Sequence, residues 1–99
     1  MKPFGFQREA REEVLAAARF YAAESPSLAG RFLDEIDSLI QSICEAPNQF
    51  RVIYPPCRRA LGSTFPYALV FVDQSERIWI VAVAHLKRRP GYWKDRIRL

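Results

Sequence analysis

The residues best suited to chemistry lie near the end of the chain, where the only histidine is followed by cations and aromatic rings. His85 closes an apolar run, and Lys87-Arg88-Arg89 and Tyr92-Trp93 come directly after it. Cations attract phosphate, aromatic faces stack on bases, and a histidine can move a proton near neutral pH. This combination predicts a site that binds a polyanion such as RNA, or that cleaves it.

Charge is unevenly divided along the chain. Residues 1–50 carry five Lys/Arg and eight Asp/Glu, a net charge of −3, whereas residues 51–99 carry ten and three, a net charge of +7. These cations could form an ordinary solvated surface. Because the excess is local and interleaved with Tyr92 and Trp93, it favours contact with phosphate or with an acidic partner.

Length and composition predict one folded domain that spans residues 1–99, since 49% of the residues are apolar and 13% are aromatic. No apolar run is long enough to cross a bilayer, and the first residues do not have the pattern of a signal peptide. Two cysteines are too few for a disulfide scaffold and form no metal-ligand pattern. We therefore expect a cytoplasmic protein with reduced thiols, no metal and no other cofactor, in which Cys44 belongs to the core and Cys57 is partly exposed.

The first half of the chain predicts a short strand followed by two helices. Phe4–Phe6 has strand-forming residues, and apolar residues then recur at helical spacing from about Gln7 to Glu24. Ser25 is expected to cap a second helix that Pro47 ends. Because the connection between them is short, the two helices should form an antiparallel hairpin.

The second half predicts strands over residues 58–61, 67–72 and 78–84, with residues 48–56 mostly in a loop. A run of helices followed by a run of strands indicates an α+β fold. In this fold the N-terminal strand and the helical hairpin pack on a mainly antiparallel sheet.

The order and spacing of several short segments resemble the RelE/ParE superfamily of toxins from type II toxin–antitoxin modules. The resemblance extends over nearly the whole chain, and its ending is similar to that of plasmid-stabilisation proteins. The segments are Ala10-Arg11-Glu12-Glu13, Ser25-Pro26, Arg31-Phe32-Leu33-Asp34-Glu35-Ile36, Ala46-Pro47, Phe50, Arg58-Arg59-Ala60-Leu61, Phe65-Pro66-Tyr67, Ala82-Val83-Ala84-His85 and Arg89-Pro90-Gly91-Tyr92-Trp93.

The resemblance implies a toxin that arrests growth and that a cognate antitoxin neutralises in a hetero-oligomeric complex. ParE-like members inhibit DNA gyrase, and RelE-like members are metal-independent endoribonucleases that cut mRNA on the ribosome. We favour gyrase inhibition and keep the ribonuclease as the alternative, so whether the chain is an enzyme stays open. A non-toxic RNA-binding module is a third hypothesis, although no aromatic strand signature supports it.

Two overlapping sets of residues are the candidate sites. If the chain cuts RNA, the catalytic candidates are those able to transfer a proton or to stabilise negative charge: Arg59, His85, Arg89 and Tyr92. The candidates for binding the target or the antitoxin are Arg58, Lys87, Arg88, Arg89, Trp93 and Lys94.

Each candidate also has a structural interpretation. His85 shares strand parity with Trp79, Val81 and Val83 and is equally well explained as a packed histidine. Only one of Arg58 and Arg59 can point to a given face of their strand, and Trp93 is expected to fasten the tail onto the sheet. The carboxylates Asp34, Glu35 and Asp37 are expected to lie on an exposed helical face.

Overall fold

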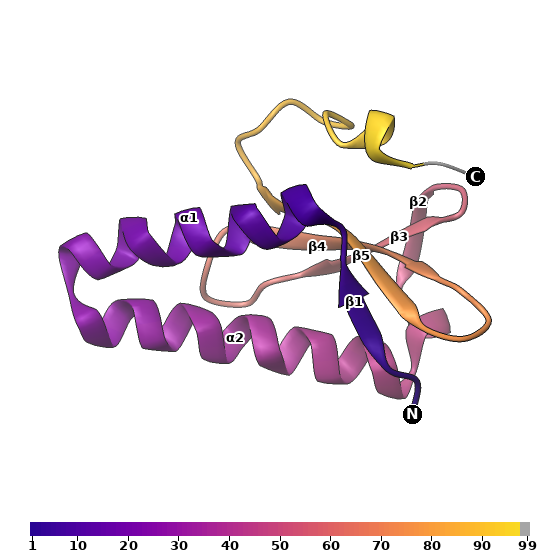
Figure 1. Ribbon diagram of the computed structural model, residues 1–99, viewed down its shortest axis with the longest axis horizontal. Coiled ribbons are helices and arrows are strands. Elements are labelled where there is room, and N and C mark those ends of the chain that lie inside the picture. Colours follow the sequence, from indigo (N-terminus) through magenta and orange to yellow (C-terminus); the bar gives the residue numbers. More distant parts are fainter. Residues whose placement is uncertain (98–99) are drawn as a thin grey trace.

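The computed structural model describes residues 1–97 and has a five-stranded sheet with two helices on one side and the end of the chain on the other (Figure 1). The elements are β1 (Phe4–Phe6), α1 (Arg8–Glu24), α2 (Pro26–Glu45), β2 (Arg51–Tyr54), β3 (Cys57–Leu61), β4 (Tyr67–Asp73) and β5 (Ile78–His85). Short 3₁₀ turns cover Pro47–Gln49 and Lys94–Arg96.

The strands are ordered β1-β5-β4-β3-β2 across the sheet. The neighbouring strands from β5 to β2 pair antiparallel, and β1 alone pairs parallel, with β5. The α+β architecture predicted from the sequence is therefore confirmed.

The helices form where the apolar periodicity predicts them and begin or end within a residue of the expected positions. Phe32, Ile36 and Ile40 form the buried stripe of α2. Ser25 occupies the N-cap position of α2 as predicted, but its hydroxyl hydrogen-bonds the Ser27 hydroxyl at 2.9 Å and makes no capping hydrogen bond to the helix backbone.

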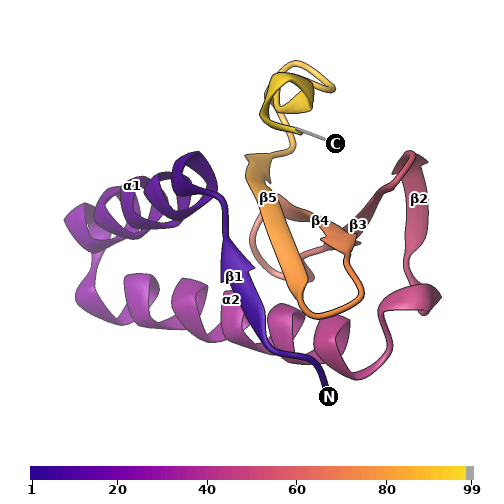
Figure 2. The ribbon, with the colours of Figure 1, turned by 45° about the vertical axis from the view of Figure 1, so that its right-hand side comes forward.

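The sheet is buried on both faces, and this gives the molecule two apolar cores. The helix-side core packs α1 and α2 against the sheet and includes Ile36, Phe71 and Val83. The tail-side core lies on the opposite face, where the C-terminal segment covers the central strands (Figure 2). Its buried members are Cys57, Val70, Val72, Val81, Ala82 and Trp93.

The strand β2 lies in a segment that was expected to be mostly loop. Pro55 and Pro56 follow it directly and donate no backbone hydrogen bond, which argues against a central strand. The sheet accommodates them because β2 is an edge strand, whose one partner strand within residues 1–97 is β3. The prolines lie in the turn between the two strands, where no ladder hydrogen bond is required of them.

A β-bulge in β5 changes the face on which the last residues of this strand lie. Val70 pairs with Ala82 and Phe71 pairs with Ile80, so Val81 is an extra residue with no partner in β4. Val81 and Ala82 both contribute to the tail-side core, whereas Val83 returns to the helix side. The expected shared parity of His85 with Val81 is therefore wrong.

Two further side chains depart from expectation. Glu35 accepts hydrogen bonds from Ser63 Oγ at 2.9 Å and from the amides of Thr64 and Phe65 at 2.8 and 2.9 Å, so it ties the β3–β4 loop to α2. Burial acts to raise the pKa of Glu35, but these hydrogen bonds outweigh it and lower the pKa overall. Cys57 is fully buried, and this burial raises the pKa of its thiol to about 11.

Candidate functional site

The C-terminal segment, residues 86–97, is called the tail here, and it lies across the tail-side core. Trp93 is only 5% exposed, which confirms that its indole fastens the tail to the sheet. Gly91 adopts a φ of +76°, a backbone conformation that glycine tolerates best, at the point where the tail turns. The tail is therefore anchored in its middle by an apolar side chain, and cations lie on both sides of the anchor.

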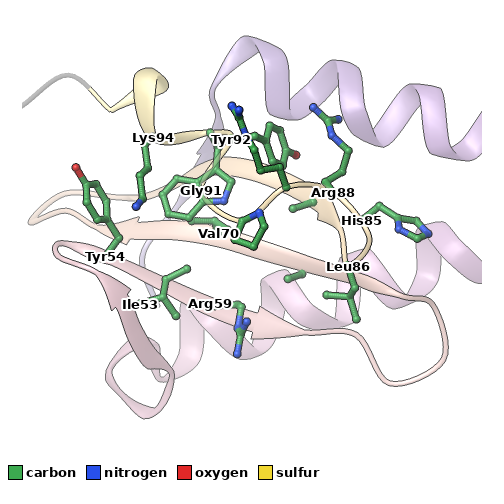
Figure 3. Close-up of a pocket in the computed structure, with 15 residues that line it drawn as sticks. Ile53, Tyr54, Arg59, Val70, His85, Leu86, Arg88, Gly91, Tyr92 and Lys94 are labelled. Carbon is green, nitrogen blue, oxygen red and sulfur yellow. The ribbon is translucent and has the colours of Figure 1, made fainter.

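A groove of about 290 Å³ lies between the tail and the sheet (Figure 3). Apolar side chains such as Ile53, Val70 and Leu86 line it together with four cations, which are Arg59, Arg88, Arg89 and Lys94. No carboxylate among residues 1–97 lines this groove. An apolar floor with a positively charged rim suits a ligand that is both apolar and anionic.

The neighbouring residues Arg58 and Arg59 point to opposite faces of β3. Arg59 pairs with Val70 of the tail-side core and lines the groove. Arg58 pairs with Phe71 on the helix side, and its guanidinium donates to the Phe50 carbonyl at 2.7 Å. The structure therefore brings Arg59 to the groove and gives Arg58 a structural contact on the other face.

Lys94 joins the tail to the edge strand β2. Its Nζ lies 4.4 Å from the centroid of the Tyr54 ring, a cation–π contact, and the same ring packs edge-on against Trp93 with 6.0 Å between centroids. Figure 3 shows Lys94 and Tyr54 next to each other at one end of the groove. Lys94 is exposed, as are Lys87 and Arg89.

The Tyr92 hydroxyl is not directed at the groove, because it donates a 2.6 Å hydrogen bond to Oε2 of Glu13. Burial and this hydrogen bond together raise the pKa of Tyr92 above its ordinary value. Arg88 stacks over the Tyr92 ring, with 3.8 Å between the guanidinium carbon and the ring centroid. Arg88 and Tyr92 therefore act as a pair, with the cation facing solvent and the hydroxyl facing α1.

Glu13 is a site residue that sequence reasoning missed. Besides Tyr92, its carboxylate accepts two hydrogen bonds of 2.9 Å from Arg96 and one of 3.0 Å from the Val83 amide. The hydrogen bond to Glu13 raises the pKa of Arg96 despite the opposing effect of burial. A signal was available, since Glu13 lies three residues after Ala10 and four before Ala17, on the buried stripe of α1.

His85 lies at the margin of the groove, and its ring points away from Val70 and Gly91 (Figure 3). The imidazole packs edge-on against Tyr67 on the helix side, with 5.0 Å between centroids, and its Nδ1 accepts from the Lys87 amide at 3.0 Å. This is the environment of a packed histidine that also stabilises the turn after β5.

The four nuclease candidates all line the groove, but the two groups that would transfer protons are already hydrogen-bonded to other residues. His85 Nδ1 accepts from the Lys87 amide, and the Tyr92 hydroxyl donates to Glu13. Within residues 1–97, no three His, Cys, Asp or Glu side chains are arranged to hold a metal ion. The arrangement favours ligand binding over acid–base catalysis.

Comparison with known proteins identifies the family of this chain and a solved structure with a similar fold. The model of the family described as "ParE toxin of type II toxin-antitoxin system, parDE" matches residues 5–90. The fold is similar to that of a chain from the structure "Chromosomal ParDE TA system from P. aeruginosa", with a TM-score of 0.76 and 18% sequence identity, over 88% of this chain and 98% of that one. No curated protein matches the sequence at a significant level. No helix within residues 1–97 has the length and hydropathy needed to span a membrane.

Proposed function

Because this chain belongs to the ParE toxin family of type II toxin–antitoxin systems, we propose that it arrests growth by binding DNA gyrase without catalysing a reaction. The observation that carries this proposal is the groove under the tail. It presents Arg59, Arg89 and Lys94 around an apolar floor, whereas the Tyr92 hydroxyl is bonded to Glu13 and the His85 Nδ1 to the Lys87 amide. Such a surface can dock a protein but lacks the aligned acid and base that RNA cleavage requires.

A cognate antitoxin neutralises the toxin in this proposal by filling the same groove with an acidic and apolar segment. The segment would be disordered when free and would fold on binding, in the cytoplasm where both proteins act. Apolar contacts with Ile53 and Leu86 should supply most of the affinity, and the cations should mainly accelerate association. The complex should therefore persist at moderate salt, and its dissociation there would show that charge pairing dominates.

The test of the target compares two activities of the purified chain, inhibition of DNA supercoiling by gyrase and cleavage of mRNA on ribosomes. We expect inhibition of supercoiling and no cleavage. Cleavage that Tyr92→Phe and His85→Ala each abolish would instead establish the RelE-like endoribonuclease and overturn the proposal.

The test of the groove uses charge reversal at exposed positions. Lys87→Glu with Arg89→Glu should abolish both growth arrest and gyrase inhibition, because both side chains are exposed and Arg89 lines the groove. Arg88 is left unchanged in this variant, since it also contacts Tyr92. The matched control is Arg19→Glu with Arg31→Glu, which makes the same change in net charge on the helical hairpin and should retain both activities. Equal activity of the two double variants would exclude the groove as the docking surface.

A further inference from the structure

Glu13 places a carboxylate inside a cationic cluster of the tail. Its Oε2 accepts from the Tyr92 hydroxyl at 2.6 Å and from Arg96 Nη2 at 2.9 Å, and Arg88 Nη1 lies 3.9 Å from the same oxygen. Its Oε1 accepts from Arg96 Nη1 at 2.9 Å and from the Val83 amide at 3.0 Å. The two oxygens thus receive four hydrogen bonds, which is about the capacity of a carboxylate.

This cluster has the composition of an anion-binding site that is already occupied from within. The Arg96 guanidinium engages both carboxylate oxygens, the geometry that makes such pairs strong. The Glu13 side chain is only 16% exposed, so solvent screens these contacts less than it would screen a surface ion pair. Without the carboxylate, Arg88 and Arg96 would lie on the same Tyr92 ring with no charge between them.

Besides the contacts of Glu13, other hydrogen bonds hold the tail to its surroundings: Arg96 Nη1 donates to the Val81 carbonyl at 3.2 Å, and the Leu86 amide donates to the Pro66 carbonyl at 2.9 Å. The regular structure of the tail within the described residues is the three-residue turn Lys94–Arg96, and it adds no strand to the sheet. Trp93 packs in the tail-side core and so holds the tail to the face of the sheet. Glu13 belongs to α1 and also bonds the Val83 amide of β5, so its hydrogen bonds to Tyr92 and Arg96 connect the tail to both of these elements. The rim of the groove therefore depends on a residue that does not line it.

We propose that Glu13 is a positioning residue, whose carboxylate serves as the internal anion that fixes the tail and so sets where Arg88, Arg89 and Lys94 meet a ligand. This inference rests on the proposed function for the role of the groove in growth arrest. The position of the tail can nevertheless be measured without any target.

The experiment uses the full chain with Glu13→Ala and measures hydrogen exchange of the tail amides. We expect exchange of residues 88–97 to accelerate by about tenfold or more, the effect of losing charge-assisted hydrogen bonds worth about 1.5–3 kcal/mol. Formate at about 0.1 M should slow the exchange again, because it supplies a carboxylate to the vacated cradle, whereas chloride at equal ionic strength should not. Glu12→Ala, at an exposed position of the same helix, should exchange like the native chain.

If Glu13→Ala does not fold, the same exchange measurement is made on Glu13→Gln, which keeps the shape of the side chain and removes its charge. It should also accelerate exchange of the tail, and native-like protection in this variant would overturn the proposal. Equal rescue by formate and chloride would overturn it as well, because the effect would then be one of ionic strength.

Growth arrest separates this inference from the function on which it rests. Glu13→Ala should weaken arrest at matched soluble levels, and full toxicity beside a loosened tail would overturn the positioning role. A native chain that does not arrest growth would refute the proposed function, while the exchange measurements would still decide whether Glu13 fixes the tail.

Discussion

Replacing Tyr92 with phenylalanine removes one hydroxyl and leaves every ring contact of the tail in place. The lost interaction is a 2.6 Å hydrogen bond to an ionised carboxylate, a type worth about 1.5–3 kcal/mol. The value should lie at the low end, because Glu13 keeps its hydrogen bonds from Arg96 and from the Val83 amide. We therefore expect Tyr92→Phe to lower the free energy of unfolding by about 1.5 kcal/mol, or the melting temperature by about 6–12 °C.

The same hydroxyl predicts a pH dependence. Burial and the bond to Glu13 raise the pKa of Tyr92 above the ordinary tyrosine value of about 10. Because the pKa of Tyr92 is higher in the folded chain than in the unfolded chain, its protonated form stabilises the fold. This stabilisation is complete when the pH is below the pKa in the unfolded chain, and it is lost as the pH rises through the pKa in the folded chain. Above about pH 10, the native chain should therefore lose stability faster than Tyr92→Phe does. Tyr67, whose pKa burial raises to about 12, contributes equally to both proteins and cancels in the difference.

The assay is urea unfolding at neutral and alkaline pH, followed by circular dichroism. Tyr54→Phe is the matched control, because it removes a hydroxyl from an exposed ring and should change the free energy by less than about 0.5 kcal/mol. A change below that size for Tyr92→Phe as well would refute the assigned strength of the Glu13 contact. Growth arrest by Tyr92→Phe should be retained, since the ring that packs the tail remains.

Three further predictions concern the helices. Ile36→Ala removes a side chain that is 4% exposed in the helix-side core and should destabilise by about 2–5 kcal/mol in the same unfolding assay; a cost under about 1 kcal/mol would contradict its packing. Gly30→Ala should stabilise by about 0.5–1 kcal/mol, because a Cβ at this position of α2 meets no atom within 4 Å; a loss of stability would mean that the site is crowded. Glu35 has a lowered pKa, so its contribution is present above its ordinary value of 4.5 and is lost as the pH falls. The free energy of unfolding should therefore fall less between neutral pH and pH 3 in Glu35→Ala than in the native chain. An equal fall in both proteins would show that protonation of Glu35 does not cause the loss of stability in acid.

The sequence predicted the elements whose pattern is local and regular. The apolar stripes set α1 and α2, and the uninterrupted apolar runs set β4 and β5, because the residues that form each element also carry its periodicity. The edge strand β2 escaped notice because Pro55 and Pro56 suggest a loop, and the partner that makes Arg51–Tyr54 a strand is β3. Edge position is a property of the whole sheet and is not encoded in those four residues.

The candidate site was predicted only in part, and each feature that the sequence did not predict has a specific physical cause. The cationic groove follows from composition, but the direction of His85 depends on the bulge at Val81, which inverts the alternation of β5. Glu13 resembles a solvated glutamate of an alanine-rich helix, and its partners lie 70 to 83 residues further along the chain. Contacts of that range become visible only when the tail is placed on the sheet.

The placement of the cations also bears on the kind of ligand that the groove accepts. The net charge of residues 51–99 suggests a surface for a long polyanion, yet Arg58 donates to the Phe50 carbonyl, and Arg96 is paired with Glu13. The charges that remain at the groove, including Arg59 and Lys94, surround an apolar floor. A protein surface that combines apolar and acidic side chains would use both the floor and the cations. This distribution of charge favours a protein target, as the proposed inhibition of gyrase by docking requires.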